Sequence, residues 1–288
     1  MELQQLRYVL AVAETRSFTR AAEQCFVVQS ALSHQVAKLE RELGLKLFAR
    51  TSRRVELTQA GAAFLPAARE CLAAADRAAS EASAALGEVR GRLSVGAIPT
   101  VAAVDIPELL ERFYQAHPQV QVTLSTGAST VMVEQVAAGE LDVAFLGLPE
   151  QREPRGVQVR ELARDDLVAV LPPGHHLAGR SQITLAQLTE ETFADFPADS
   201  PGRAQSDLAF AAAGLDREVT FEVAMPDHMI GLVRRGLAVA LLAATFIGDR
   251  PGVVTVPVAD GPRRVEYLVW NEFNPAPAVR AFLDMVES

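Results

Sequence analysis

Apolar residues recur at helical spacing through the first part of the chain and predict three short helices. The first covers about residues 3–13, and a hydroxyl within residues 17–19 can cap a second, short helix over residues 20–25. A break of four residues precedes a third helix over residues 30–43, which Gly44 should end. Two helices joined by a short turn behind a supporting helix are typical of a helix-turn-helix.

The residues after this segment predict a two-stranded hairpin. Residues 46–48 and 55–57 are short and strand-like, and the segment between them holds Arg50, Arg53 and Arg54. A hairpin with a basic tip can contact nucleic-acid phosphates, whereas a solvated loop is the alternative for the same arginines. We favour phosphate contact because the hairpin follows a helix-turn-helix.

A single long helix is expected over residues 58–89. Residues 62–86 contain 12 alanines, and small or apolar side chains recur in alternating steps of four and three, which is the spacing of a coiled-coil seam. We favour a dimer seam, with a helix docked on its own chain as the alternative. The seam positions are Phe64, Ala68, Cys71, Ala75, Ala78, Ala82, Ala85 and Val89.

Beyond Gly87 and Gly91 the pattern changes to apolar, strand-like runs that alternate with helical runs. A strand–helix–strand–helix–strand order indicates a parallel sheet covered by helices. The first set has strands at residues 93–98, 120–125 and 143–146, with helices at 104–116 and 129–138. The second has strand-like runs at 166–171, 185–188, 192–195, 220–223, 238–242 and 265–270, with helices at 203–213, 227–235 and 277–286. Two α/β lobes leave a cleft in which a ligand can bind.

Charge is unevenly distributed along the 288 residues. The formal net charge is −9, yet residues 1–91 carry 12 basic and 10 acidic side chains. An excess of bases at one end is a hint of nucleic-acid contact there. The hydrophobic fraction of 49% and the charged fraction of 22% are ordinary for a globular protein, which excludes the disordered, collagen-like and disulfide-dense classes.

An enzyme and an exported solute-binding protein are the alternatives to a DNA-binding protein. The chain lacks GxSxG, HExxH, GxGxxG and GKS or GKT motifs, and its only lysines are Lys38 and Lys46, so the α/β part has no Schiff-base or phosphate-binding lysine. The first residues lack the basic stretch and apolar run of an export signal. The apolar run at 236–247 has 12 residues, whereas a membrane span needs about 20. We expect a cytoplasmic protein that is not an enzyme and does not contact a membrane.

Short motifs fill the first 61 residues and carry a family resemblance. They are Phe18-Thr19-Arg20-Ala21-Ala22-Glu23, Gln29-Ser30-Ala31-Leu32-Ser33, Leu39-Glu40, Glu42-Leu43-Gly44, Leu47-Phe48, Arg50, Arg53 and Leu57-Thr58-Gln59-Ala60-Gly61. Looser motifs follow at residues 91–96, 139–144 and 235–240. In this order and without gaps they resemble the LysR-type transcriptional regulators, and the resemblance covers essentially the whole chain.

The resemblance implies a domain order as well as a function. It implies an α winged helix-turn-helix DNA-binding domain over residues 1–60, a dimerising linker helix over 61–90, and an α/β two-lobed, periplasmic-binding-protein-like effector domain over 91–288. Lobe I would cover about residues 91–163 and 266–288, and lobe II about residues 164–265. It further implies binding to double-stranded DNA, regulation by a small-molecule effector, assembly as a homodimer or homotetramer, and contact with RNA polymerase. No cofactor or metal is expected.

The N-terminal end of the third helix should contact base edges in the major groove. The candidates there are Gln29, Ser30, Ser33 and His34, while Arg50, Arg53 and Arg54 are the candidates for phosphate contact. A glutamine such as Gln29 can bond adenine N6 and N7 together. Relatives typically have a hydroxyl where Val28 stands and a proline where Ser30 stands. Val28 cannot cap the helix with its side chain, so we expect Ser30 to do so and to shift the helix start onward.

Three loops should meet an effector in the cleft, at residues 99–101, 127–130 and 199–202. Exposed N–H groups at a helix N-terminus favour an anion, so a small carboxylate is the expected effector class. Capping of the helices is the alternative role for the hydroxyl groups. The candidate effector contacts are Thr100, Ser129, Thr130, Gly147, Ser200 and Met225, with Leu146 in the apolar wall.

Cysteines and histidines add two smaller hypotheses. Cys25 and Cys71 both precede residue 92, which disfavours the cysteine-pair peroxide sensing that some relatives carry out in the effector domain. Cys71 falls on the seam, where a cross-chain disulfide is the alternative to a buried small residue. His175 and His176 are adjacent in a turn, but no third ligand stands at a typical metal-site spacing, so we favour an exposed loop.

Overall fold

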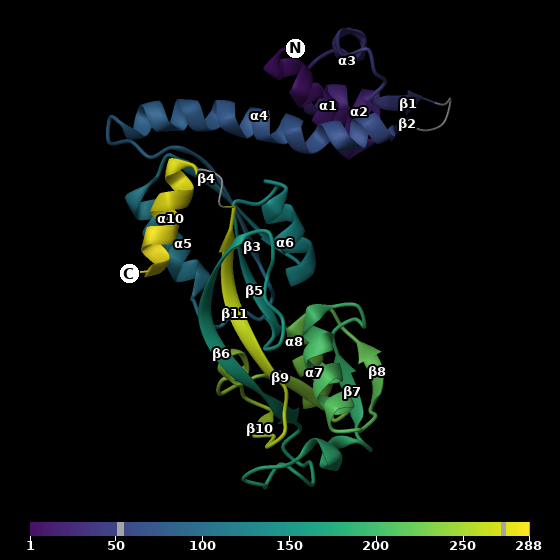
Figure 1. Cartoon of the computed structure of the whole chain (residues 1–288). Helices are drawn as coiled ribbons and strands as arrows, with labels where there is room; N and C mark the ends of the chain where they lie inside the picture. The colour runs from purple at the N-terminus through teal and green to yellow at the C-terminus, as the bar shows by residue number, and fades with distance from the viewer. Residues whose placement is uncertain (51–54, 272–274, 288) are drawn as a thin grey trace. The chain divides into compact units, whose positions relative to one another are not determined.

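The computed structural model describes residues 1–50, 55–271 and 275–287. The chain divides into two compact units (Figure 1). The N-terminal unit comprises residues 1–91 with 138–140, and the C-terminal unit comprises residues 92–137 and 141–288. No helix within the described ranges is long and apolar enough to cross a membrane.

The N-terminal unit opens with three helices and a hairpin. The helices are α1 (Leu3–Thr15), α2 (Phe18–Gln24) and α3 (Gln29–Leu43), and strands β1 (Phe48–Arg50) and β2 (Val55–Leu57) pair antiparallel. This arrangement confirms the predicted helix-turn-helix.

Local caps and a shared core explain why these helices form. The Ser17 hydroxyl accepts a hydrogen bond from the backbone N–H of Arg20 at 3.3 Å and caps α2. Gly44 ends α3 with a φ of 67°, a left-handed conformation that glycine adopts at little cost. The side chains packed between the helices are almost fully buried and include Leu6, Val9, Val12, Ala21, Leu32, Val36 and Leu39.

The expected start of α3 was wrong. Ser30 does not cap this helix; Val28 occupies the N-cap position in extended conformation, and the helix begins at Gln29 without a side-chain cap. The carbonyl of Val28 accepts hydrogen bonds from the N–H groups of Ala31 and Leu32 at 3.1 and 3.3 Å, so the backbone alone initiates the helix. Val28 therefore provides no side-chain cap, and the helix nevertheless begins one residue before Ser30.

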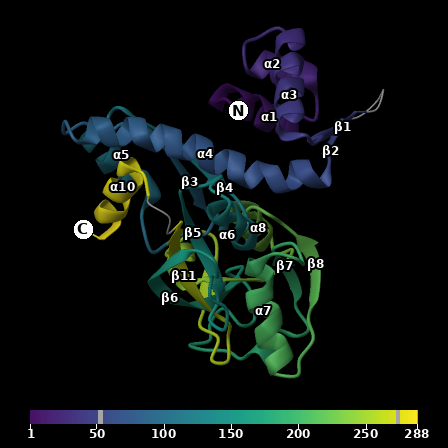
Figure 2. The same cartoon turned by 45° about the horizontal axis from the view of Figure 1, so that its top comes forward.

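The long helix α4 (Gln59–Ala84) begins where the Thr58 hydroxyl accepts a hydrogen bond from the N–H of Gly61 at 2.9 Å. It ends five residues before the predicted boundary at 89. Figure 2 shows the three smaller helices over its N-terminal half. Gly61 is required here because a Cβ would collide with the backbone carbonyl of Leu47.

The structure divides the predicted seam of α4 into two parts. Ala68 is 2% exposed and packs in the core of its own N-terminal unit with Phe64 beside it, so this part matches the docked-helix alternative. Cys71, Ala78, Ala82 and Ala85 are exposed in the single chain and remain candidates for a dimer seam.

The C-terminal unit is built on a mixed sheet with strand order β10-β6-β11-β5-β3-β4, and β9 also pairs with β6. Strands β3 and β5 are parallel, as the predicted crossover order requires, and β11 runs antiparallel to both β5 and β6. The strands are β3 (Gly91–Ala97), β4 (Val120–Thr126), β5 (Val143–Pro149), β6 (Gln158–Leu171), β9 (Ala240–Ala243), β10 (Val254–Val256) and β11 (Arg263–Trp270).

Helices cover this sheet, and a smaller parallel pair, β7 (Thr192–Asp195) and β8 (Glu218–Glu222), lies in the second lobe. In the first lobe, the rings of Phe113 and Phe145 pack edge-on against Phe282, with centroids 5.4 and 6.4 Å away. The helices are α5 (Ile106–Ala116), α6 (Ser129–Ala137), α7 (Pro201–Ala212), α8 (Pro226–Arg234), α9 (Ala244–Ile247) and α10 (Pro277–Glu287).

Two predicted strands of this unit were wrong in extent or type. Residues 185–188 form a short 3-10 helix, η1 (Leu185–Leu188), because Thr184 and Gln187 make a reciprocal capping box. Strand β6 is 14 residues long and starts eight residues before the prediction. Its first half alternates exposed and half-buried residues, so it lacks the apolar run that marked the second half.

The long strands β6 and β11 join the two lobes and run side by side (Figure 1). In the first lobe β11 pairs with β5, and in the second lobe β6 pairs with β9 and β10. The predicted lobe boundaries at 163/164 and 265/266 fall within these two strands.

Candidate functional site

A cavity of about 360 Å³ lies between the two lobes of the C-terminal unit. Its wall includes residues that follow β3, the last residue of β4, part of β5, and the N-terminal ends of α6 and α7. Ligands of open α/β sheets bind at this kind of edge, where strands end and helices begin. The volume lies near the lower end of the range for small-molecule sites.

Five of the six candidate effector contacts line this cavity: Thr100, Ser129, Gly147, Ser200 and Met225. The sixth, Thr130, does not line it and is exposed, because one step along a helix turns the side chain by about 100° from that of Ser129. Leu146, which the sequence placed in the apolar wall, is fully buried but is also not among the lining residues. Alternation along β5 points neighbouring side chains to opposite faces.

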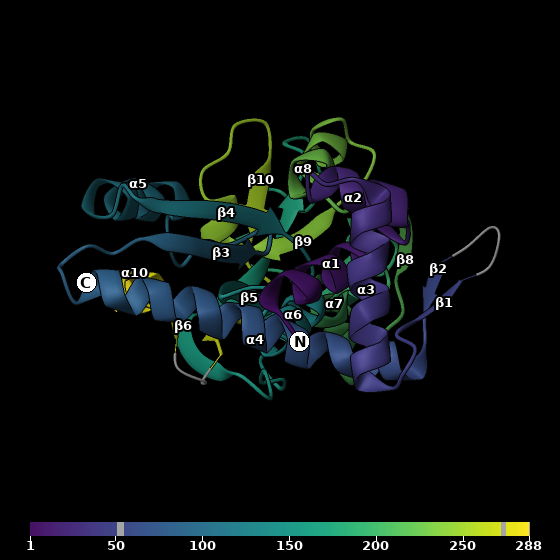
Figure 3. The same ribbon diagram turned by 90° about the horizontal axis from the view of Figure 1, so that it is seen from above.

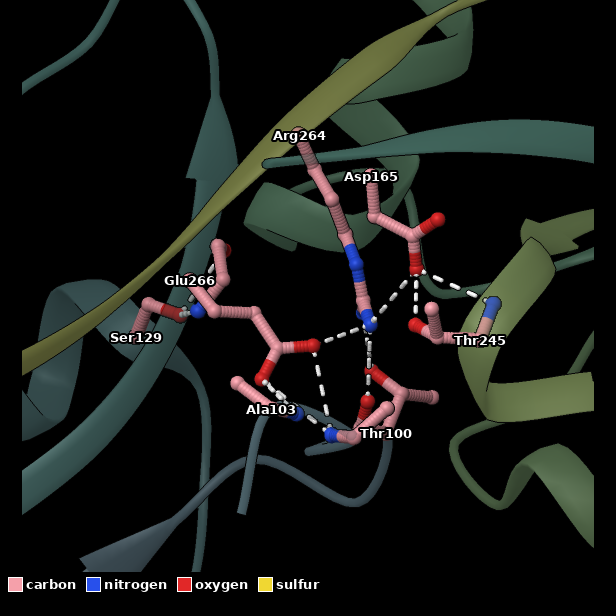
Figure 4. Close-up of polar contacts among 9 residues, drawn as sticks. Thr100, Ala103, Ser129, Asp165, Thr245, Arg264 and Glu266 are labelled. Atoms are coloured by element: carbon pink, nitrogen blue, oxygen red, sulfur yellow. Dashed lines mark hydrogen bonds and ion pairs between the residues drawn. The ribbon is translucent and has the colours of Figure 1, made fainter. Parts of the chain in front are cut away.

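The small size of Gly147 keeps part of the cavity open. A Cβ at this position would lie 2.6 Å from Cδ1 of Ile98, which real side chains do not tolerate. The Ser129 hydroxyl donates to the carbonyl of Gly147 at 3.0 Å and accepts from its N–H at 3.1 Å (Figure 4). Ser129 therefore ties the start of α6 to β5. Ser200 accepts from the N–H of Arg203 at 3.2 Å and caps α7, the structural role that the sequence left open.

A buried charged network reaches the wall through Arg264 on β11 and Thr100, and its centre is Arg264 (Figure 4). The Arg264 guanidinium donates to the Thr100 hydroxyl at 2.9 Å and to the Thr100 carbonyl at 3.0 Å. It also pairs with Glu266, and one oxygen of Asp165 lies 3.7 Å from its Nη2. Asp165 in turn accepts from the N–H of Thr245 at 3.2 Å and from its hydroxyl. The network connects the loop after β3, the two long strands and α9.

Sequence reasoning missed Arg264, although a signal was present. Arg264 and Glu266 stand two residues apart in a strand, a spacing that puts both side chains on one face. Both are nearly completely buried, with residue exposures of 3% and 2%. Burial lowers the pKa of the Arg264 guanidinium, and the carboxylates of Glu266 and Asp165 counteract this effect.

The candidate base contacts lie in the first turns of α3, and the β1–β2 hairpin follows this helix in the N-terminal unit (Figure 3). Gln29, Ser30 and His34 have exposed side chains, and Ser33 is half-buried. The four residues stand at i, i+1, i+4 and i+5, so they cover two adjacent rows on the helix surface. Arg50 ends β1, whereas Arg53 and Arg54 lie outside the described residues.

Two family models match the chain in the order of the two units. Residues 3–62 match "Bacterial regulatory helix-turn-helix protein, lysR family", and residues 86–288 match "LysR substrate binding domain". The chain belongs to the LysR family. It is a DNA-binding transcriptional regulator with an effector-binding domain, and not an enzyme.

Individual LysR-family proteins resemble the chain over its full length. It is 32% identical to the HTH-type transcriptional regulator BudR of Raoultella terrigena, over 99% of this chain and 100% of that protein. Full-length OxyR of Pseudomonas aeruginosa, with a cysteine replaced by aspartate, superposes with a TM-score of 0.76 at 26% identity, covering 100% and 94% of the two chains. Full-length CbnR in complex with its target DNA gives a TM-score of 0.68 at 26% identity, covering 100% and 99%.

The two cysteines of this LysR-family chain both precede its effector-binding domain. Its effector-binding residues 92–288 contain no cysteine in the sequence, because the two cysteines are Cys25 and Cys71. Burial raises the pKa of the Cys25 thiol, and the negative charge of Glu14 raises it further. A raised pKa reduces the thiolate fraction of Cys25 and with it the reactivity of the thiol.

The adjacent histidines lie close to Glu191, a contact that their spacing in the sequence did not predict. Glu191 lies 3.1 Å from Nε2 of His175 and 3.8 Å from Nε2 of His176, and the three ligand atoms are within 4.8 Å of one another. However, Nδ1 of His175 accepts a hydrogen bond from the N–H of Leu177, which leaves the Nε2 proton facing Glu191. The expectation of an exposed loop holds for His176 only, since His175 is largely buried.

Proposed function

We propose that this regulator binds DNA sites with an interrupted dyad and that a small molecule in the interlobe cavity changes its DNA contacts. The observation that carries the proposal is the cavity, which lies where the two lobes meet on β6 and β11. A ligand that touches both lobes has a different affinity for open and closed arrangements and so shifts their populations.

The proposed DNA contacts separate into two classes. Gln29, Ser30, Ser33 and His34 contact base edges from the exposed end of α3. The arginines of the hairpin, Arg50, Arg53 and Arg54, contact phosphates and supply affinity that does not depend on base sequence.

The proposed effector contacts are Thr100, Ser129, Gly147, Ser200 and Met225, all of which line the cavity. Thr130 is not among them. The expectation of a small carboxylate depended on the N-terminus of α6 alone. Arg264, the single basic side chain among the lining residues, is already paired, so we do not extend the proposal to a carboxylate.

Self-association and further partners complete the proposal. The exposed alanines of α4 support a homodimer, from which a homotetramer can be assembled. The regulator acts in the cytoplasm, where its DNA is, and contacts RNA polymerase when bound beside a promoter. It needs no cofactor.

Selection of genomic fragments on the full-length protein tests the proposed function. At about physiological salt, where non-specific phosphate binding is weak, we expect a few fragments that share an interrupted dyad. The genes beside them nominate effectors, and a footprint that changes with such a compound supports the cavity's regulatory role. Uniform recovery of unrelated fragments, with and without candidate compounds, contradicts the proposal.

A further inference from the structure

The cavity wall holds a positive charge that is already neutralised. Among the described residues that line the cavity, Arg264 is the only one with a basic side chain. Its guanidinium pairs with Glu266, and Asp165 is 3.7 Å away, so two carboxylates surround one cation. A ligand carboxylate would be a third anion at this place, and the guanidinium charge that could pair with it is already shared by two carboxylates.

Neither carboxylate is free to move away and release Arg264. Glu266 accepts hydrogen bonds from the N–H groups of Ala102 and Ala103, at 3.1 and 3.0 Å for the same oxygen. Asp165 is held by both the N–H and the hydroxyl of Thr245 (Figure 4). These bonds fix the network before any ligand arrives.

A second polar group of the wall has no partner at all. Gln205 lies on α7, is 7% exposed and lines the cavity, and its amide makes no hydrogen bond with any residue that the structure describes. The amide offers two donors and one acceptor to the cavity, and no described residue uses them. Gln205 therefore favours a ligand that can donate and accept at the same place.

Most of the remaining wall is apolar. Ile98, Leu167, Phe196 and Leu241 contribute aliphatic and aromatic surface from both lobes. Such a wall binds the body of a ligand by burying apolar area and fixes its orientation by few polar groups.

We propose that the cavity of this chain binds an uncharged, largely apolar molecule with one carboxamide-like group that pairs with Gln205. The inference rests on the proposed function, in that a small effector occupies the cavity. It replaces a carboxylate with a neutral donor–acceptor group as the chemical class to be sought.

Matched pairs of probes test this inference on the full-length protein. Benzamide and sodium benzoate have nearly the same shape and differ in charge, as do cyclohexanecarboxamide and its carboxylate. A ligand that binds the folded state raises the melting temperature as its concentration increases. We expect both amides to raise it, with dissociation constants at least about tenfold lower than those of the acids, which corresponds to about 1.4 kcal/mol.

Two variants test whether Gln205 and Glu266 cause the preference for amides over carboxylates. Gln205→Leu preserves the approximate size of the side chain and removes the amide, so it should weaken benzamide binding about tenfold and leave the protein folded. Glu266→Gln removes one of the two anions beside Arg264 and should shift the preference toward benzoate. The first variant tests the inference even if the second does not fold.

The inference is overturned if the carboxylates bind as well as the amides, if Gln205→Leu leaves benzamide binding unchanged, or if no probe raises the melting temperature. Genomic selection tests the regulator separately. A protein that selects a dyad but prefers benzoate refutes this inference only, whereas one that binds benzamide in the cavity but selects no DNA sequence refutes the proposed function.

Discussion

Arg264 donates a hydrogen bond to the hydroxyl of Thr100 at 2.9 Å, although 164 residues separate them in the sequence. The contact joins β11, which passes between the lobes, to the loop that follows β3 at the edge of the cavity. Both residues line the cavity, so the same bond contributes to stability and shapes the ligand site.

Thr100→Val should destabilise the C-terminal unit by about 1–3 kcal/mol, because Nη1 of Arg264 loses its acceptor in a buried place. Thr100→Ser retains the hydroxyl and is the matched control. Urea unfolding followed by fluorescence of Trp270, the single tryptophan, measures the difference. Unchanged stability of Thr100→Val would show that the hydrogen bond to Arg264 does not contribute.

Glu40→Gln should destabilise the N-terminal unit at neutral pH. Burial would raise the pKa of Glu40, but the hydrogen bonds from Lys46 and from the N–H groups of Phe48 and Leu47 outweigh burial and hold the pKa below its ordinary value. A carboxyl group with a depressed pKa in the folded state stabilises that state at pH values above its ordinary pKa, about 4.3 for glutamate. This contribution is lost as the pH falls through the lower pKa of the folded state.

The expected loss for Glu40→Gln is about 1.5–3 kcal/mol at neutral pH, and the difference from the unchanged protein should diminish in acid. Thermal unfolding of the full-length chain across this pH range, with hydrogen exchange of α3 amides to identify the transition, measures it. Glu23→Gln, on the exposed surface of α2, should have little effect at any pH. A loss for Glu40→Gln that is constant with pH would rule out the charged interaction as its source.

Short-range patterns predicted the helix-turn-helix and the crossover order of the first lobe, because those elements depend on neighbours in the sequence. The contacts of Arg264 were missed because they depend on the register of β11 against β6. Gln205 was missed because a polar residue on a helix is normally exposed, although Phe210 and Pro201 mark the buried face of α7. Thr130 was predicted to contact the effector but does not line the cavity, because its neighbour Ser129 occupies the helix face that does.

Gln29→Ala should change which base is preferred at one position of the DNA half-site. The Gln29 side chain is exposed at the first position of α3, and a glutamine that bonds adenine bidentately discriminates by about 1–3 kcal/mol. Sequencing of fragments selected from a randomised site compares the variant with the unchanged protein. An identical base preference in the two selections would remove Gln29 from the base contacts.

Arg53→Ala should weaken binding to all sites by a similar factor. A phosphate contact carries no base preference, and its loss reduces the dependence of log K on log salt by about 1. Titrations of one specific and one unrelated duplex at several salt concentrations measure the slope. A loss confined to the specific duplex, with the slope preserved, would identify Arg53 as a base contact.

Ala82→Glu should reduce the assembled mass of the full-length protein. Ala82 is exposed on α4 and belongs to the part of the seam that the core of its own unit does not cover. Small residues in this seam allow the two helices of a dimer to approach closely. The substitution brings two like charges and two larger side chains into this narrow interface. Ala63→Glu is the matched control, because Ala63 is exposed on the same helix and is not a seam position. Sedimentation of both variants should show a lower mass for Ala82→Glu alone. If both variants retain the mass of the unchanged protein, α4 does not form the dimer interface.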